Sequence, residues 1–110
     1  MHKSRLAGFI IDCETDDLDA AAEFWSNALG APRRSVSAAS EGRYVGLDVA
    51  PVDLHVEVQI VDHPSRVHLD IESDDIEAET RRLVALGAKK IGDVADWRIM
   101  EAPTGQRFCI

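Results

Sequence analysis

Two segments of the chain place chemically capable side chains at matching positions. "VHLDIESDDIEA", residues 67–78, repeats "FIIDCETDDLDA", residues 9–20, at an offset of 58 residues. Asp70 of the later copy matches Asp12 of the earlier one, whereas His68 is matched by Ile10. An imidazole titrates near neutral pH and binds metal ions, and an isoleucine does neither. The two copies therefore share an architecture, and the repeat predicts that only one of them carries the titratable contact.

Strand alternation selects further candidate residues. In "LHVEVQIV" (54–61) and "RVHLDIES" (66–73), polar side chains alternate with aliphatic ones, so each strand has one apolar and one polar face. Because buried unpaired charges are costly, we expect the polar faces to meet water or a ligand. The aliphatic faces are expected to lie under the helices. The candidate ligand-pocket residues are Ile10, Asp12, His55, Glu57, Gln59, His68, Asp70, Arg98 and Cys109.

The repeat extends through two amphipathic helices. "NALGAP" (27–32) matches "VALGAK" (84–89), and Asp16 and Asp74 are expected as the helix N-caps. Gly30 and Gly87 are expected to end the helices. Each copy then continues with short strands, including "RRSVSA", "RYVGLDVA" and "LHVEVQIV" in the first, and "KKIG", "WRIMEA" and "RFCI" in the second.

This order predicts an α+β fold made of two βαβββ modules. They are expected to form a cupped mixed β-sheet with the helices on its outer face. The chain is interpreted as one domain, residues 1–110, with module one at about 5–61 and module two at about 66–110.

Composition excludes several classes of partner. The formal net charge of −8 argues against nucleic acid and anionic membranes, and no apolar run approaches the roughly 20 residues that span a bilayer. "MHKSRLAGF" lacks the apolar region of a signal peptide, and Cys13 and Cys109 have no zinc-like spacing, so we expect a cytoplasmic protein with free thiols. The acidic composition is typical of bacterial-type domains. Open sheet edges favour a homodimer.

The chain resembles the vicinal oxygen chelate superfamily, specifically its short glyoxalase-like domains. The resemblance rests on "RVHLDIESDDIEAETRRLVALGA" (66–88), "WRIMEAPTGQRFCI" (97–110) and the echo "IDCETDDLDAAAEFWSNALGA" (11–31), which together cover most of the chain. It implies paired βαβββ modules. Members of the superfamily include lactoylglutathione lyases, extradiol dioxygenases, fosfomycin-modifying enzymes and non-catalytic bleomycin-binding proteins.

The resemblance also implies where a metal would bind, because metal-dependent members take one ligand from the first and last strand of each module. His68 and Cys109 stand at two of those positions, Ile10 at a third, and Glu57 or Gln59 at the fourth. Since Ile10 cannot bind a metal, we expect a degenerate site and no cofactor. If a divalent metal is bound, the candidate ligands are His68, Glu57 and Cys109, with His55 as an alternative to Glu57.

The sequence is compatible with two functions. The first is a small-molecule-binding domain without turnover, whose acidic cup suits a cationic ligand. The second is a divalent-metal-dependent lyase or an extradiol-type dioxygenase with an altered ligand set. In the first, His68 is a pocket histidine hydrogen-bonded to a carboxylate, and Cys109 is a small buried thiol.

Overall fold

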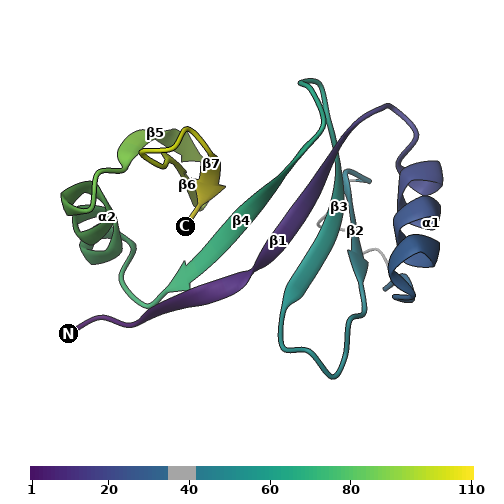
Figure 1. Cartoon of the computed structure of the whole chain (residues 1–110), viewed down its shortest axis with the longest axis horizontal. Coiled ribbons are helices and arrows are strands. Elements are labelled where there is room, and N and C mark those ends of the chain that lie inside the picture. The colour runs from purple at the N-terminus through teal and green to yellow at the C-terminus, as the bar shows by residue number, and fades with distance from the viewer. Residues whose placement is uncertain (35–41) are drawn as a thin grey trace. The chain divides into compact units, whose positions relative to one another are not determined.

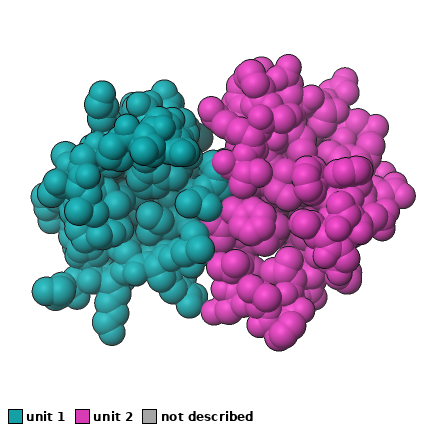
Figure 2. Space-filling model, in the orientation of Figure 1, with its two compact units in different colours: residues 1–7, 68–110 teal, residues 8–67 magenta. Residues whose placement is uncertain are grey.

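The computed structural model describes residues 1–34 and 42–110, and the fold is α+β as predicted (Figure 1). Two compact units are present, Gly8–Val67 and Met1–Ala7 together with His68–Ile110 (Figure 2), and each is described by itself. The elements are β1 (Ser4–Glu14), α1 (Leu18–Leu29), β2 (Tyr44–Leu47), β3 (His55–Val61), β4 (Arg66–Ser73), α2 (Ile76–Ala85), β5 (Lys89–Val94), β6 (Trp97–Glu101) and β7 (Arg107–Cys109).

The unit Gly8–Val67 is built around β3. This strand runs parallel to β1 and antiparallel to β2, and Arg33 adds an isolated antiparallel bridge to Leu47. The bridge lies where the sequence predicts the first strand after α1. The remainder of that predicted strand, from residue 35 on, lies outside the described residues.

The other unit repeats this arrangement with a complete set of strands. β7 runs parallel to β4 and antiparallel to β6, which pairs antiparallel with β5. In both units the first strand is therefore parallel to the last, as expected for two copies of one supersecondary unit. The registers also correspond, because Asp12 pairs with Gln59 in one unit and Asp70 with Cys109 in the other.

Each helix covers the apolar face of its own strands. Ile11, Val56 and Val58 are buried in one cluster with Leu18 and Trp25 of α1. In the other unit Leu83 of α2 packs with Met100 and Ile110, and Ile71 and Phe108 adjoin them. Burying this aliphatic surface is the main source of stability for both units.

One expectation about the apolar faces is wrong in part. Val67 and Leu69 of β4, predicted to lie under the second helix, are 58% and 53% exposed. The cluster beneath α2 includes Ile71 of this strand and neither of the other two. A helix of ten residues is about 15 Å long, so α2 covers only part of an eight-residue strand.

The helix N-caps are Asp17 and Asp75, one residue later than predicted. Their carboxylates accept hydrogen bonds of 3.0 Å from the backbone N–H of Ala20 and Ala78, which the first turn leaves without a helical partner. Asp74 serves instead as an acceptor for the backbone N–H of Lys3, at 2.8 Å.

The prediction that Gly30 and Gly87 end the helices is confirmed by their backbone conformations. Gly30 follows α1 in the left-handed conformation, with φ 64°. Gly87 follows α2 with φ 109°, a backbone conformation that residues with a Cβ atom rarely adopt.

The N-terminal end of β1 belongs with β4 in one unit. The backbone N–H of Asp74 donates to the carbonyl of Lys3 at 3.1 Å, and the hydroxyls of Ser4 and Ser73 are 2.9 Å apart. These contacts let β1 begin at Ser4. They also group Met1–Ala7 with the second repeat, so the compact units differ from the sequence-based module bounds. Among the described helices, neither is long and apolar enough to cross a bilayer.

Candidate functional site

Three chemically distinct side chains converge on one face of the second repeat. His68 and Asp70 lie on β4 and Cys109 on β7, and one ligand atom from each lies within 4.8 Å of the others. The Nε2 of His68 is 3.5 Å from Oδ1 of Asp70. The parallel register brings Asp70 opposite Cys109, and the two-residue period of a strand puts His68 on the same face. The alternation predicted from the sequence thus brings together three of the nine candidates.

These three donors lie on the face of the strands opposite α2. Phe108 packs against the cluster beneath α2 and Ile110 lies within it, so Cys109, between them, points the other way. The Asp70 residue is only 4% exposed, the His68 side chain is 16% exposed, and Cys109 is half-buried. The site therefore combines a buried carboxylate with a partly exposed imidazole and a half-buried thiol.

Asp70 is buried, and so is Asp12 at 2% exposure, on the polar face that the sequence predicts to meet water or a ligand. A carboxylate tolerates burial when a cationic or hydrogen-bonding partner lies beside it. His68 supplies such a partner for Asp70, and Arg66 places its Nε 3.9 Å from Oδ2 of Asp12. Alternation predicted the face correctly, and tertiary packing decided its burial.

The first repeat carries different side chains at the corresponding positions. Ile10, Asp12 and Gln59 correspond to His68, Asp70 and Cys109 through the matching registers. The structure thus decides between the two residues that the sequence left open, because Gln59, rather than Glu57, is the counterpart of Cys109. The Nε2 of Gln59 donates to the Tyr44 hydroxyl at 3.0 Å. This position offers a neutral amide where the second repeat offers a thiol.

Two further candidates, His55 and Glu57, belong to the other compact unit. They contact each other on β3. Asp70 joins His68 and Cys109 in the donor cluster, and Glu57 as a metal ligand stays a prediction from the sequence. The signal for Asp70 was present in the sequence, since His68 and Asp70 are two residues apart on one strand and must share a face.

Arg98 faces α2 and is absent from the donor cluster. Its Nη2 lies 2.7 Å from a Glu77 carboxylate oxygen, and its Nη1 donates to the Thr80 hydroxyl at 3.0 Å. Its Nε donates to Asp93, also at 3.0 Å. The hydrogen bonds to Glu77 and Asp93 raise the pKa of the Arg98 guanidinium above its usual value. Arg98 thus ties α2 to β5 and β6.

The two thiols differ in environment. The Cys13 thiol lies under α1 near Trp25, and burial raises its pKa. Its Sγ lies 3.7 Å from the carbonyl of Ile11. Cys13 is therefore a protonated thiol packed against the cluster beneath α1, whereas Cys109 lies beside an imidazole and a carboxylate.

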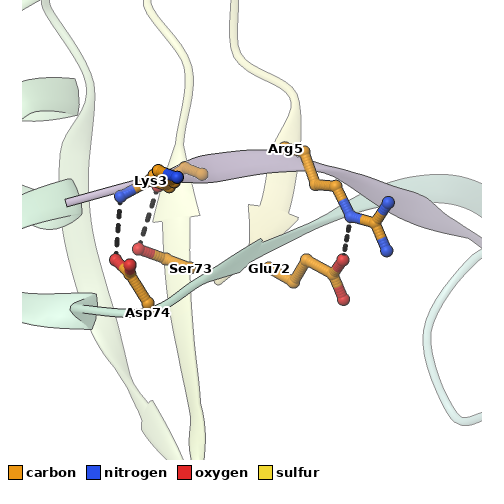
Figure 3. Close-up of a pocket in the computed structure, with 6 residues that line it drawn as sticks. Lys3, Arg5, Glu72, Ser73 and Asp74 are labelled. Carbon is orange, nitrogen blue, oxygen red and sulfur yellow. Dashed lines mark hydrogen bonds and ion pairs between the residues drawn. The ribbon is translucent and has the colours of Figure 1, made fainter.

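A groove of about 540 Å³ lies elsewhere in the same unit (Figure 3). Its lining consists of Lys3, Ser4, Arg5, Glu72, Ser73 and Asp74, none of which is among the sequence candidates. Figure 3 shows that these side chains face one another across β1 and β4, with Arg5 contacting Glu72 and the Lys3 N–H contacting Asp74. The groove thus lies where β1 and β4 run side by side, and its charged and polar side chains already contact one another.

The repeated order of strands and helix defines the class of protein. A first strand parallel to the last, in two copies with polar side chains on both, is the arrangement of the vicinal oxygen chelate superfamily. The family model for the glyoxalase-like domain matches residues 8–110, and the chain belongs to that family. None of the curated proteins matches the chain.

The superfamily implies a divalent metal, and the donor set can be compared with that expectation. Nonhaem iron in extradiol-type enzymes needs two histidines and a carboxylate, and the cluster found among the described residues has one histidine. Nitrogen, oxygen and sulfur donors together instead suit zinc, which accepts all three. The residues present therefore fit a thiophilic ion and do not fit ferrous iron.

Proposed function

We propose that this glyoxalase-like domain binds a small cationic species at His68, Asp70 and Cys109, without turning it over. The supporting observation is the buried Asp70 carboxylate beside a partly accessible imidazole and thiol. A carboxylate in a poorly hydrated environment attracts a cation more strongly than one in water. The formal net charge of −8 extends the same preference over the whole chain.

The first repeat supplies a second group of candidate contacts. Ile10, Asp12 and Gln59 occupy the corresponding positions, and His55 and Glu57 lie on the same face of β3. Ile10 provides an apolar surface and Gln59 a neutral amide. We propose them as candidate contacts within the unit Gly8–Val67.

The proposal is tested by thermal shift with a panel of small aliphatic amines and matched neutral amides. A bound molecule raises the unfolding midpoint by mass action. We expect amines to raise the midpoint of the wild type and of His63→Ala, which removes an imidazole outside the candidate contacts. In His68→Ala and Asp70→Asn the shift should be smaller, because each substitution removes a polar contact to the amine. Amines that shift every variant equally would refute this site.

A divalent-metal-dependent lyase is the second candidate function, favoured by the three donors within 4.8 Å. Zinc sites in enzymes commonly have three protein ligands and one open position, where a substrate oxygen is polarised. The dioxygenase alternative lacks comparable support, because the cluster contains one histidine. Production of a new compound from a 2-oxoaldehyde–thiol adduct by the zinc-loaded protein would favour the lyase.

We further propose that the protein is a cytoplasmic homodimer. β5 pairs only with β6 among the described strands, and the nearby side chains of Val94 and Trp97 are 58% and 47% exposed. Exposed apolar residues beside an unpaired strand edge favour association with a second copy. A thiol at the proposed site suits a reducing compartment.

A further inference from the structure

We infer that His68, Asp70 and Cys109 bind a thiophilic divalent ion of the zinc type, held entirely by the second repeat. The inference rests on the proposed function, since it names the cation recognised at the same three residues. It departs from the ligand set implied by the resemblance, in which both modules contribute. Here one repeat supplies nitrogen, oxygen and sulfur together.

The distances among the donor atoms suit a shared ion. With bonds of about 2.0–2.3 Å, two ligands of a tetrahedral zinc ion lie about 3.3–3.8 Å apart. The His68 Nε2 and Asp70 Oδ1 are already separated by 3.5 Å. The largest separation within the cluster is 4.8 Å, so a rotation of the Cys109 or His68 side chain closes the remaining difference.

The backbone supports this arrangement because both strands are central to their unit. β4 and β7 are parallel neighbours, and the residues beside Cys109 are fixed by the cluster beneath α2. The Cα positions of Asp70 and Cys109 are therefore held in register. Ligands on paired strands are positioned more accurately than ligands on loops.

The first repeat provides an internal comparison. Its equivalent positions carry Ile10, Asp12 and Gln59, which retain the carboxylate and lack both the imidazole and the thiol. The inference therefore assigns one ion per chain, rather than one per repeat. It also explains the asymmetry of the repeat, because the copy that keeps His68 is the copy that carries Cys109.

The test uses Co²⁺ as a spectroscopic substitute for zinc on chelator-treated, reduced full-length protein. A thiolate bound to Co²⁺ gives a charge-transfer absorption band in the near ultraviolet. We expect this band to saturate at one equivalent per chain in the wild type. It should persist in Cys13→Ser and be absent in Cys109→Ser, which keeps the side-chain size. Competition with zinc should remove the band.

Two further variants test the other ligands. We expect His68→Gln and Asp70→Asn to weaken Co²⁺ binding at least tenfold, and His63→Gln to leave it unchanged. Circular dichroism of each metal-free variant establishes that the fold is kept. If Asp70→Asn fails to fold, the His68 and Cys109 variants still decide the outcome.

The inference is overturned if the folded wild type shows no thiolate band, or if the band depends on Cys13. It is also overturned if His68 and Asp70 form only an ion pair, so that both can be replaced without loss of Co²⁺ affinity. Failure of the proposed function is distinguishable. Amines that shift the metal-free protein without any Co²⁺ band retain that function and reject the ion, whereas a Co²⁺ band without an amine shift retains the ion and rejects an organic cation as the ligand.

Discussion

At the scale of the residue, the Glu79 side chain shows how a charge is tolerated inside this fold. It has no exposed surface, yet Arg82 donates two hydrogen bonds to its carboxylate at 2.7 and 2.8 Å, and His2 lies 3.0 Å away. The Arg82 hydrogen bond is the largest cause that lowers the Glu79 pKa, to about 2 from 4.5. The carboxylate is thus ionised and paired at neutral pH.

Glu79→Gln tests that pairing through the pH dependence of stability. A depressed pKa in the folded state stabilises the fold above pH 4.5, and this contribution is lost as the pH falls from 4.5 to about 2. We expect the variant to be about 1–3 kcal/mol less stable at pH 7, with the difference shrinking below pH 4.5. Urea unfolding between pH 2.5 and 7 measures it, with the exposed Glu23→Gln as control. A difference independent of pH would contradict the ionised pair.

Gly8 tests the close approach of β1 and β3. A Cβ on this residue would lie 1.7 Å from the carbonyl oxygen of His55, its register partner. Because the carbonyl oxygen of His55 is a backbone atom in a parallel ladder, relief requires the strands to separate. We expect Gly8→Ala to lose at least about 3 kcal/mol in urea unfolding. Gly92→Ala, whose Cβ would meet nothing within 4 Å, is the matched control, and equal losses would argue against this strand pairing.

At the scale of the element, the two helices are begun by equivalent aspartates. Asp17 and Asp75 each accept a hydrogen bond from the backbone three residues on, and both follow an acidic residue that could have served the same purpose. The sequence pattern located the start of each helix to within one residue. The backbone geometry selected between the neighbouring carboxylates.

Asp17→Ala and Asp16→Ala separate the two possible caps of α1. Loss of an N-cap side chain leaves helix N–H groups without their acceptor and costs about 1 kcal/mol. We therefore expect Asp17→Ala to lower the stability by that amount and Asp16→Ala to change it by less than about 0.5 kcal/mol. Thermal or urea unfolding compares them. If Asp16→Ala is the more destabilising of the two, Asp16 is the N-cap, as expected from the sequence alone.

At the scale of the whole molecule, apolar side chains remain exposed in both units. Phe24 is 62% and Leu86 66% exposed, in addition to Val94 and Trp97 near the edge of β5. Single exposed apolar residues are normal in monomers. Val94 and Trp97, however, lie together near the edge of β5, and this supports the proposed homodimer.

Multi-angle light scattering tests that association. We expect a mass near twice the chain mass of 12.1 kDa, and Trp97→Glu should shift the protein towards the monomer. The exposed Phe24→Glu serves as a comparison because Phe24 lies on α1, in the other unit. A monomer at all concentrations would reject the dimer, and dissociation by Phe24→Glu alone would place the contact on α1.

The sequence by itself determined both helices and the alternation of the strands, because these follow from patterns within about twenty residues. Comparison of segments 58 residues apart revealed the repeat, and the order of the elements indicated the α+β class. The sequence also identified His68, Asp70 and Cys109 as candidates. Only the tertiary structure brought Cys109 opposite Asp70, selected Gln59 as its counterpart, and turned Arg98 towards α2. Strand pairing between distant segments sets those relations, and one register step moves a side chain to the other face. Burial of Asp70 was likewise decided by packing, since alternation predicts which side chains share a face and does not predict what covers it.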